Sequence, residues 1–325
     1  MLRRFLPECA VRFVKSVAEV PPGATLATWG LGEADVDRSR NEVVRIEDGF
    51  LRSVGLGAEL VAPLSWSIDV TGIYYDASRP SDLEEILEQE SFGARTLERA
   101  SRLRAEIVNA GLTKYNVGGR TWKRPATTQR VILVPGQVER DESIRLGAPE
   151  VKRNIDLLRA VRSSCPDAHV IYKPHPDVAS GLRRAGINDG LASQSCDEIV
   201  GDADVGDMLC HVDEVHTMTS LTGFEALLRQ LRVVTYGQPF YAGWGLTEDK
   251  LPNPRRTRKL ALDQLVAGAL LLYPRYLSRT SGKLISAEDA LTELLAWKGQ
   301  SGPRYSIKSV VRVPMRQLLR WAGDR

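Results

Sequence analysis

Short β-rich apolar runs alternate with segments of helical periodicity along most of this chain, and this alternation constrains its fold most strongly. Four such runs, with helical segments between them, stand in the second half: 130–136, 169–174, 212–218 and 232–237. Strand–helix–strand units at this spacing produce parallel sheets with crossover helices. Runs at 25–30 and 43–48, followed by two predicted helices within 81–110, form an earlier block. The pattern predicts an α/β protein of two Rossmann-like domains facing a central cleft.

The helical segments carry boundary signals of their own. Ser81 is a candidate N-cap, and Glu84 three residues later completes a capping-box pattern. Residues 149–164 predict a helix with Pro149 in its first turn, where proline is tolerated. Another helix is predicted from about Thr222 to Gln230.

The stretch 118–128, GGRTWKRPATT, is polar, basic and free of periodicity, which indicates an interdomain linker. A chain of 325 residues also exceeds the size at which single cores stop growing. We therefore predict an N-terminal Rossmann-like domain at 1–122, a C-terminal Rossmann-like domain at 123–280, and C-terminal helices with a basic tail at 281–325.

Charge and apolar content exclude several function classes. The net charge is only +3, so nothing in the total charge points to nucleic acid. The longest apolar stretch, 265–273, is far shorter than the roughly 20 residues of a membrane-spanning helix. Pro7 and Glu8 interrupt the apolar part of the basic N-terminus, which argues against a signal peptide. We expect a cytoplasmic protein.

Cysteine and histidine spacing gives no metal motif. Cys9, Cys165, Cys196 and Cys210 form no CxxC pair, and we expect reduced, mostly buried thiols. His211 and His216 fall on one predicted strand, where a separation of five residues puts them on opposite faces. No metal site is predicted.

Four motifs of the second block follow predicted strand ends, which is where open parallel sheets bind ligands. They are VPGQVERDESI (134–144), YKPHPDV (172–178), TSLTGFEALLRQ (219–230) and YGQPFYAGWGLTED (236–249). In the second, Lys173 supplies a cation and His175 a donor, and a phosphate would suit both. The alternative is a surface turn stiffened by proline.

In the third motif, Ser220 and Thr222 start a predicted helix, and Gly223 would allow close approach. A helix N-terminus binds anions readily, because its N–H groups are free and its dipole end is positive. Glu225 in the first turn could accept hydrogen bonds from a ribose. Together the second and third motifs favour a nucleotide monophosphate, although a merely capped helix stays an alternative.

The fourth motif is rich in aromatic residues that could wall a sugar or base pocket, namely Tyr236, Phe240, Tyr241 and Trp244. A packed hydrophobic loop is the alternative. Asp141, shortly after the strand at 130–136, is a candidate nucleophile, general base, or simple N-cap of the next helix.

Acidic and basic side chains also crowd the predicted strand ends of the first block. They are Glu47, Asp48, Arg52, Asp69 and Asp76. Such a cluster suits a polyhydroxylated acceptor, and salt-bridged turns are the equally weighted alternative.

Seven motifs together resemble one family, the capsule β-Kdo transferases of the KpsC/LipA type. They are RIEDGFLRS, GIYYDASRP, TKYN, GQVERDESI, KPHPDV, TSLTGFEALL and GQPFYAGWGLTED, and the resemblance covers roughly residues 25–280. Proteins of this family usually carry two such modules. This chain carries one, whose VPGQV form looks more like the C-terminal module. A single module either adds one linkage or works with a partner module.

The resemblance implies GT-B architecture, CMP-Kdo as donor, a retaining outcome and a lipid-linked Kdo oligosaccharide as acceptor. It implies that 1–122 is the acceptor domain and 123–280 the CMP-sugar donor domain, with no cofactor. Asp141 matches the family's nucleophilic aspartate. The expected donor-binding residues are Gln137, Lys173, His175, Ser220, Thr222, Gly223, Glu225, Tyr241 and Trp244. Those expected on the acceptor side, or in a structural role, are Glu47, Asp48, Arg52 and Asp76.

Basic residues recur every four positions in the tail beyond the resemblance, at Arg304, Lys308, Arg312, Arg316 and Arg320. With the apolar residues between them they suit peripheral contact with the anionic inner membrane, which a lipid-linked acceptor makes sensible. A solvated terminal helix or a disordered tail is the alternative.

Other activities stay open at this point. A sugar-nucleotide epimerase or hydrolase shares the two-domain architecture but needs no acceptor. A transferase for another CMP-linked acidic sugar, such as sialic acid, would have similar pocket chemistry. A non-catalytic binding module of capsule assembly is a third alternative, against which the intact Asp141 and phosphate motifs argue.

Overall fold

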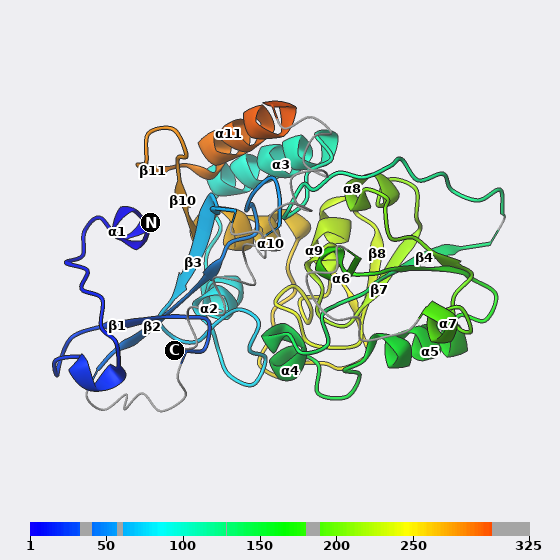
Figure 1. The fold of residues 1–325 in the computed structure, drawn as a ribbon, viewed down its shortest axis with the longest axis horizontal. Helices are drawn as coiled ribbons and strands as arrows, with labels where there is room; N and C mark the ends of the chain where they lie inside the picture. The colour runs from blue at the N-terminus through cyan, green and yellow to red at the C-terminus, as the bar shows by residue number, and fades with distance from the viewer. Residues whose placement is uncertain (33–40, 57–60, 128, 180–188, 301–325) are drawn as a thin grey trace, which may run out of the picture.

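The computed structural model describes residues 1–32, 41–56, 61–127, 129–179 and 189–300. They form two α/β halves that lie side by side, each built on its own sheet (Figure 1). The predicted fold class, two Rossmann-like domains in a GT-B-like arrangement, is confirmed.

The first sheet has five strands in the order β1-β2-β3-β10-β11. Their bounds are β1 (Leu26–Trp29), β2 (Val43–Asp48), β3 (Ser65–Asp69), β10 (Pro274–Leu277) and β11 (Leu284–Ile285). Only β1 and β2 run parallel, so the expectation of an all-parallel sheet is wrong for this half. The predicted range 123–280 for the second domain is also wrong at its end, because β10 pairs with β3.

Helices α2 (Asp82–Gln89) and α3 (Ala94–Asn109) confirm the two helices predicted within 81–110. The backbone N–H of Glu84 donates to Ser81 Oγ at 3.2 Å, which confirms the N-cap. The Glu84 carboxylate turns instead to Arg255 and Arg256, so the capping box is only half made.

The other helical segments of the first domain come from both ends of the chain. They are α1 (Leu2–Phe5), η1 (Val17–Glu19), α10 (Leu262–Val266), the π-helical turn η3 (Ala267–Leu272) and α11 (Ala287–Gln300). Helix α3 packs against α10, η3 and α11, whereas α1 packs against β10. In the apolar run at 265–273, residues 265–270 and Tyr273 are buried in this domain, whereas Leu272 is 44% exposed. No described helix is long and apolar enough to cross a membrane.

The second sheet has six strands, all parallel, in the order β6-β5-β4-β7-β8-β9. Their bounds are β4 (Val131–Pro135), β5 (His169–Lys173), β6 (Glu198–Ile199), β7 (Glu214–Thr217), β8 (Arg232–Thr235) and β9 (Glu248–Asp249). All four strands predicted in this half are confirmed. His216 lies in β7, but His211 precedes that strand, so their predicted placement on one strand is wrong.

The helices of this half are α4 (Glu142–Gly147), α5 (Asn154–Ser164), α6 (Pro176–Ala179), α7 (Asp189–Ala192), α8 (Val205–Met208) and α9 (Leu221–Leu228). Helix α9 confirms the helix predicted from about Thr222. Helix α5 begins at Asn154, so Pro149 lies outside it. The reason lies in the preceding loop: Asn154 N–H donates to Glu139 at 2.8 Å, and the Asn154 side chain bonds Gln137.

One hydrophobic core runs through both domains. It contains Leu83 and Leu103 of the first domain together with Val131 and Val215 of the second sheet. At the junction Phe50 stacks on Phe240 with ring centroids 4.5 Å apart. Because the domains share this core, we expect them to unfold together.

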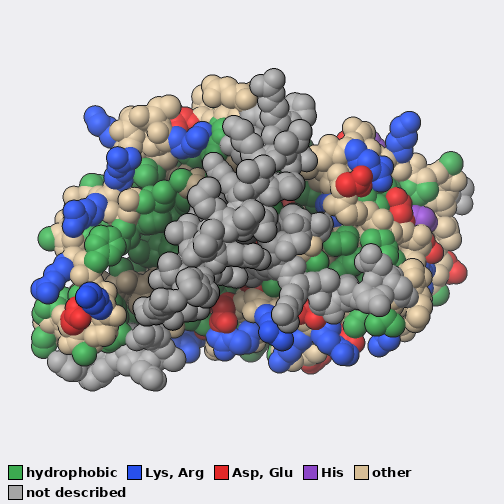
Figure 2. All heavy atoms as spheres, in the orientation of Figure 1, with side chains coloured by type: hydrophobic (Ala, Val, Ile, Leu, Met, Phe, Trp, Pro, Cys, Tyr) green, Lys and Arg blue, Asp and Glu red, His purple; other side chains and the backbone are tan. Residues whose placement is uncertain are grey.

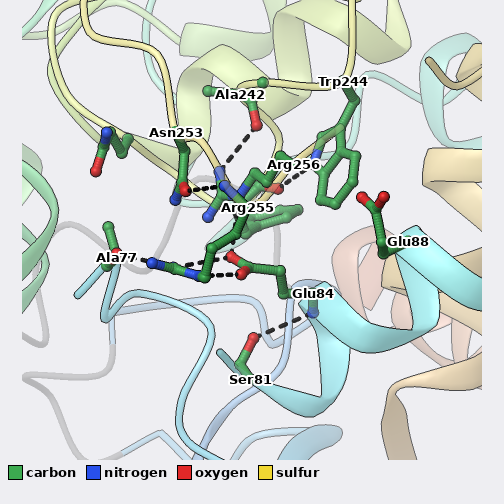
Figure 3. Close-up of polar contacts among 12 residues, drawn as sticks. Ala77, Ser81, Glu84, Glu88, Ala242, Trp244, Asn253, Arg255 and Arg256 are labelled. Carbon is green, nitrogen blue, oxygen red and sulfur yellow. Dashed lines mark hydrogen bonds and ion pairs between the residues drawn. The ribbon is translucent and has the colours of Figure 1, made fainter. Parts of the chain in front are cut away.

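A buried ion cluster also joins the domains (Figure 3). Arg256 donates to Glu84 of α2 at 3.0 Å and to the Ala242 carbonyl at 2.8 Å. Arg255 donates to the other Glu84 oxygen at 2.6 Å. The side chains of Glu84 and Arg256 are only 8% and 3% exposed. The segment 253–258 therefore holds the loop at 239–244 against α2.

The predicted linker is held against the second domain at Arg120, Trp122 and Arg124. Trp122 is 1% exposed, its backbone N–H donates to Asp207 at 2.8 Å, and its indole donates to Glu198. Arg124 pairs with Asp213 at 2.7 Å. The segment is thus an ordered connection.

All four cysteines are free thiols. Cys165 and Cys196 are buried, but Cys9 and Cys210 are exposed, so the expectation of mostly buried thiols holds for only half of them.

Candidate active site

A cleft of about 1490 Å³ lies between the two domains. Strand ends of both sheets line it, as expected for parallel α/β folds. It collects eleven of the fourteen predicted site residues: Glu47, Asp48, Arg52, Asp76, Gln137, Asp141, Lys173, His175, Ser220, Thr222 and Glu225. Residues from five separate segments therefore meet in one place.

Asp141 is half-buried on the cleft wall and caps the start of α4. Its Oδ1 accepts hydrogen bonds from the backbone N–H of Ser143 at 3.0 Å and from Ser143 Oγ at 2.8 Å. Both bonds orient the carboxylate. The N-cap alternative is thus realised, and it is compatible with a chemical role because the residue also lines the cleft.

Lys173 and His175 follow β5 into the cleft. Lys173 Nζ lies 3.4 Å from the Gly201 carbonyl, and burial lowers the pKa of its ammonium. His175 Nδ1 accepts the backbone N–H of Asp177 at 3.1 Å. The neutral ring therefore carries its proton on Nε2.

The start of α9 is capped by Ser220, whose Oγ accepts the backbone N–H of Thr222 at 3.2 Å. The two hydroxyl groups lie 3.2 Å apart. The eight-residue helix points this N-terminus into the cleft, where its dipole favours an anion.

Gln137 is held by the protein itself. Its Nε2 donates to Thr219 Oγ1 at 2.9 Å, and its Oε1 accepts the Thr219 backbone N–H at 2.9 Å. The amide thus joins the loop after β4 to the loop after β7, and it positions α9.

Three predicted donor residues, Gly223, Tyr241 and Trp244, do not line the cleft. Tyr241 and Trp244 are fully buried. Tyr241 donates its hydroxyl proton to the Ser220 carbonyl, and the Trp244 indole donates to the Phe240 carbonyl at 2.8 Å. The prediction of direct donor contact is therefore wrong for these residues. Of the four aromatic residues in this motif, only Phe240 lines the cleft.

Gly223 serves a packing role. A Cβ atom there would lie 2.2 Å from Tyr241 Oη and 2.7 Å from Tyr241 Cζ. The glycine thus admits the Tyr241 ring beneath the N-terminus of α9.

We expect Gly223→Ala to lower the free energy of unfolding by about 1–3 kcal/mol, because the buried tyrosine must shift to accommodate the methyl group. Urea denaturation measures this change. Gly299→Ala is the control, since a Cβ there meets nothing within 4 Å. Equal stability of the two variants would contradict the packing role.

Glu225 is buried in the second turn of α9, not in the first as predicted, and it accepts the Lys114 backbone N–H at 2.8 Å. Burial raises the pKa of this carboxyl from 4.5 to about 7. The residue therefore links the two domains through one hydrogen bond and titrates close to neutral pH.

The raised pKa of Glu225 sets the direction of a pH effect. Between about pH 4.5 and 7 the folded state keeps a proton that the unfolded state has lost. Its contribution to stability therefore falls as the pH rises through this window, by up to about 3 kcal/mol, and is constant above it. Relative to wild type, Glu225→Gln should gain stability between pH 5 and pH 8 in urea denaturation. A parallel pH dependence of both proteins would refute this.

On the first-domain wall, Asp48 and Arg52 form an ion pair, and burial raises the pKa of Glu47. Asp76 is tied into its own turn by Ser78 Oγ at 2.6 Å and Arg79 at 3.1 Å. Asp69 lies outside the cleft lining and binds the Gly72 backbone N–H at 2.7 Å. The salt-bridged-turn alternative thus fits the Asp48–Arg52 and Asp76–Arg79 pairs, and these four residues line the cleft together with Glu47.

Lys114 and Tyr75 also line the cleft, although no role was predicted for either residue. Burial alone would lower the pKa of Lys114, but neighbouring tyrosines and carboxylates raise it overall. Burial is the main cause that raises the pKa of the Tyr75 hydroxyl, and the negative charge of Glu47 raises this pKa further. Both residues stand within quoted motifs, TKYN and GIYYDASRP, and that was the available signal.

No group of three or more His, Cys, Asp or Glu residues in the described part of the chain is arranged to hold a metal ion. The described cations of the second-domain wall include Lys173 and Arg145.

Residues 32–120 and 114–276 match the family model for capsule polysaccharide biosynthesis proteins. The chain belongs to this family. It is 46% identical over 302 residues to the capsule polysaccharide modification protein LipA of Neisseria meningitidis serogroup A, covering 90% of this chain and 43% of LipA. The chain thus spans less than half of that relative. It is also 46% identical over 277 residues to the lipopolysaccharide-processing protein LpsZ of Rhizobium meliloti, covering 82% of this chain and 62% of LpsZ.

Solved structures of the family share the fold. The β Kdo 2,7 transferase of Thermosulfurimonas dismutans KpsC matches with a TM-score of 0.78 and 42% identity, covering 91% of this chain and 95% of that chain. The β Kdo 2,4 transferase of the same KpsC matches with a TM-score of 0.71 and 34% identity, covering 83% and 86%. The resemblance to the KpsC/LipA type is confirmed.

Proposed function

We propose that this chain is a retaining β-Kdo glycosyltransferase that transfers Kdo from CMP-Kdo to a Kdo-bearing, lipid-linked acceptor in capsular polysaccharide biosynthesis. The observation that carries the proposal is the place of Asp141. It is an oriented carboxylate on the wall of an interdomain cleft that a helix N-terminus and two basic side chains also line. The 42% identity to a β Kdo 2,7 transferase along 91% of the chain supports it.

The donor's phosphate would bind between the loop after β5 and the start of α9. Lys173 and His175 Nε2–H supply hydrogen-bond donors, and the Ser220 and Thr222 hydroxyls with the α9 dipole supply the remaining contacts. Glu225 would bind the ribose or the cytosine. We propose no cofactor, because these groups supply the positive potential that the leaving phosphate needs.

The proposed chemistry is a double displacement. An Asp141 oxygen attacks the anomeric carbon of Kdo while the bond to the phosphate oxygen breaks, and CMP leaves with the electron pair. An acceptor hydroxyl then attacks the same carbon, and the Asp141 carboxylate leaves. Two inversions at one carbon retain the configuration.

Glu47 is the group that we propose accepts the proton of the acceptor hydroxyl. It lies on the first-domain wall, and Asp141 and Asp48 contribute electrostatically to its raised pKa, after burial as the main cause. A carboxylate with a raised pKa is a better general base. Asp48, Arg52 and Asp76 would shape the wall around the acceptor.

The rim of the cleft suits an anionic acceptor. Figure 2 shows Lys and Arg side chains gathered along the lower edge of this face, near the position of α4 in Figure 1. Arg79 and Arg145, with side chains 52% and 59% exposed, line the cleft from the first and second domains. Kdo residues each carry a carboxylate that such a rim attracts.

The test is incubation with CMP-Kdo or CMP-sialic acid and a synthetic Kdo-terminated glycoside, with mass spectrometry of the glycoside. Addition of one Kdo, from CMP-Kdo only, is expected. Addition of sialic acid instead would support the alternative of another CMP-linked acidic sugar. CMP release without glycoside product would favour a hydrolase, and no turnover would favour a non-catalytic capsule-assembly module.

The greater identity to the 2,7 transferase supports a β2,7 linkage, which NMR of the product checks.

The predicted membrane-contacting tail, 303–325, lies outside the described residues. We propose from its basic residues that it holds the protein at the inner membrane beside its lipid-linked acceptor. Deleting 303–325 should lower binding to phosphatidylglycerol-containing liposomes about tenfold in sedimentation assays, with no change towards neutral liposomes. Equal binding of the shortened and full-length chains to phosphatidylglycerol-containing liposomes would contradict this proposal.

A further inference from the structure

Two tryptophans of the first sheet line the cleft and have no role in the proposal above. Trp29 ends β1 and is 53% exposed, whereas Trp66 of β3 is 6% exposed. Their ring centroids lie 5.5 Å apart with the planes at 73°. Phe5 stacks on Trp66 at 4.2 Å. The stack fixes Trp66, and it leaves about half of Trp29 accessible at the cleft.

One hydrogen-bond donor of this tryptophan pair and one acceptor next to it lack partners among the described residues. Trp66 Nε1 and Asp48 Oδ1 are both buried and make no hydrogen bond. Asp48 and Trp66 are paired directly across β2 and β3. The other Asp48 oxygen is bound by Arg52, which fixes the carboxylate. Buried polar atoms without partners are rare, because each costs free energy unless a ligand or water satisfies it.

The pair also adjoins the proposed reaction centre. Gly30 follows Trp29, and a Cβ atom at Gly30 would lie 3.1 Å from Tyr75 Oη and 3.6 Å from Glu47 Oε2. Glu47 and Tyr75 both lie within electrostatic reach of Asp141. Trp29 therefore lies one residue from the backbone that adjoins the proposed general base, and Trp29 and Glu47 line the same cleft.

We propose that Trp29, Trp66 and Asp48 form a subsite for a sugar residue of the acceptor glycan, an inference that rests on the proposed function. The C–H face of a pyranose packs on the Trp29 indole. One hydroxyl accepts the Trp66 Nε1–H, and another donates to Asp48 Oδ1. An acyl chain would leave both polar atoms unsatisfied, so the polar pair favours a sugar over the lipid part of the acceptor.

Steady-state kinetics with CMP-Kdo and a synthetic Kdo disaccharide glycoside test the subsite in the full-length chain. Trp29→Ala should raise the KM for the glycoside about tenfold, with kcat and the KM for CMP-Kdo unchanged. Trp66→Phe keeps the ring but lacks the N–H, and a rise of about threefold or more is expected. Phe13→Ala is the control, because Phe13 is 71% exposed and lies outside the cleft lining.

A second readout needs no turnover. Binding of the same disaccharide glycoside should change the tryptophan fluorescence of wild type, and the change should be lost in Trp29→Phe. An unchanged KM for the glycoside in both tryptophan variants would overturn the subsite. The subsite would also be overturned if the tryptophan substitutions slowed CMP release from CMP-Kdo without acceptor as much as they slowed transfer. That result would place the two tryptophans on the donor side. Failure of the proposed function gives a different result from these two outcomes, because wild type would then neither release CMP nor transfer Kdo. The fluorescence measurement would still test whether the glycoside binds at Trp29.

Discussion

Asp141→Asn is expected to lower kcat for Kdo transfer at least about 10³-fold while CMP-Kdo still binds. An amide is too weak a nucleophile for the anomeric carbon, so the first displacement stops. Asparagine caps helices as well as aspartate does, so the start of α4 should keep its hydrogen bonds from Ser143. The substitution therefore separates the chemical role from the structural one. Asp156→Asn is the matched control, because Asp156 pairs with Arg153 on α5 outside the cleft lining.

Intact-protein mass spectrometry after exposure to CMP-Kdo shows the intermediate directly. Wild type should gain the mass of one Kdo, and Asp141→Asn should not. Glu47→Gln should accumulate the adduct when acceptor is present, because the first displacement proceeds and the second lacks its base. An adduct on Asp141→Asn would move the nucleophile to another residue. Rapid turnover without an adduct in Glu47→Gln would refute the assignment of the base.

Arg256→Ala is expected to lower the free energy of unfolding by about 3–5 kcal/mol. The substitution leaves buried Glu84 with one partner fewer, and it strands the carbonyls of Pro239 and Ala242. Arg255→Ala should cost less, because the Arg255 side chain is 31% exposed and water can replace part of its bonding.

Urea denaturation at constant pH measures both effects. Arg102→Ala is the control, since the Arg102–Glu98 pair is 68% and 63% exposed and should contribute under about 0.5 kcal/mol. Arg256→Lys keeps the charge but loses the planar fork, so it should recover only part of the stability. A cost of Arg256→Ala no greater than that of Arg102→Ala would show that the cluster does not hold the domains together.

The sequence alone predicts which residues lie at the strand ends. It does not predict the environment of a side chain that packs against segments far away in the chain. Asp141, Lys173 and Ser220 were found because each lies at or shortly after the end of an apolar strand, and the ends of parallel strands meet at one edge. Tyr241 and Trp244 were misassigned because an aromatic residue suits a core and a sugar pocket equally well. Packing beneath α9 decides the role of Tyr241, and the position of Arg256 decides that of Trp244.

The return of the chain to the first sheet was also beyond reach of local patterns. The apolar composition of the run at 265–273 indicates that it is buried, but it does not indicate against which sheet the run packs. The pairing of β10 with β3 depends on contacts more than 200 residues apart, such as Tyr273 Oη donating to Asp69 at 2.8 Å. Lys114 escaped notice for the same reason, because its neighbours Tyr74, Asp48 and Glu47 come from other segments.

Because β10 and β11 complete the first sheet, the second domain is an insertion with two connections. Chimeras between relatives with different linkage specificity would therefore need two crossovers, one near Trp122 and one before Pro274. The second lies beyond Arg255 and Arg256, so a grafted second domain brings these arginines to a foreign α2. A recipient without a carboxylate at the position of Glu84 would receive two cations with no counter-charge. Successful recombination should thus depend on matching this one helix more than on matching the cleft.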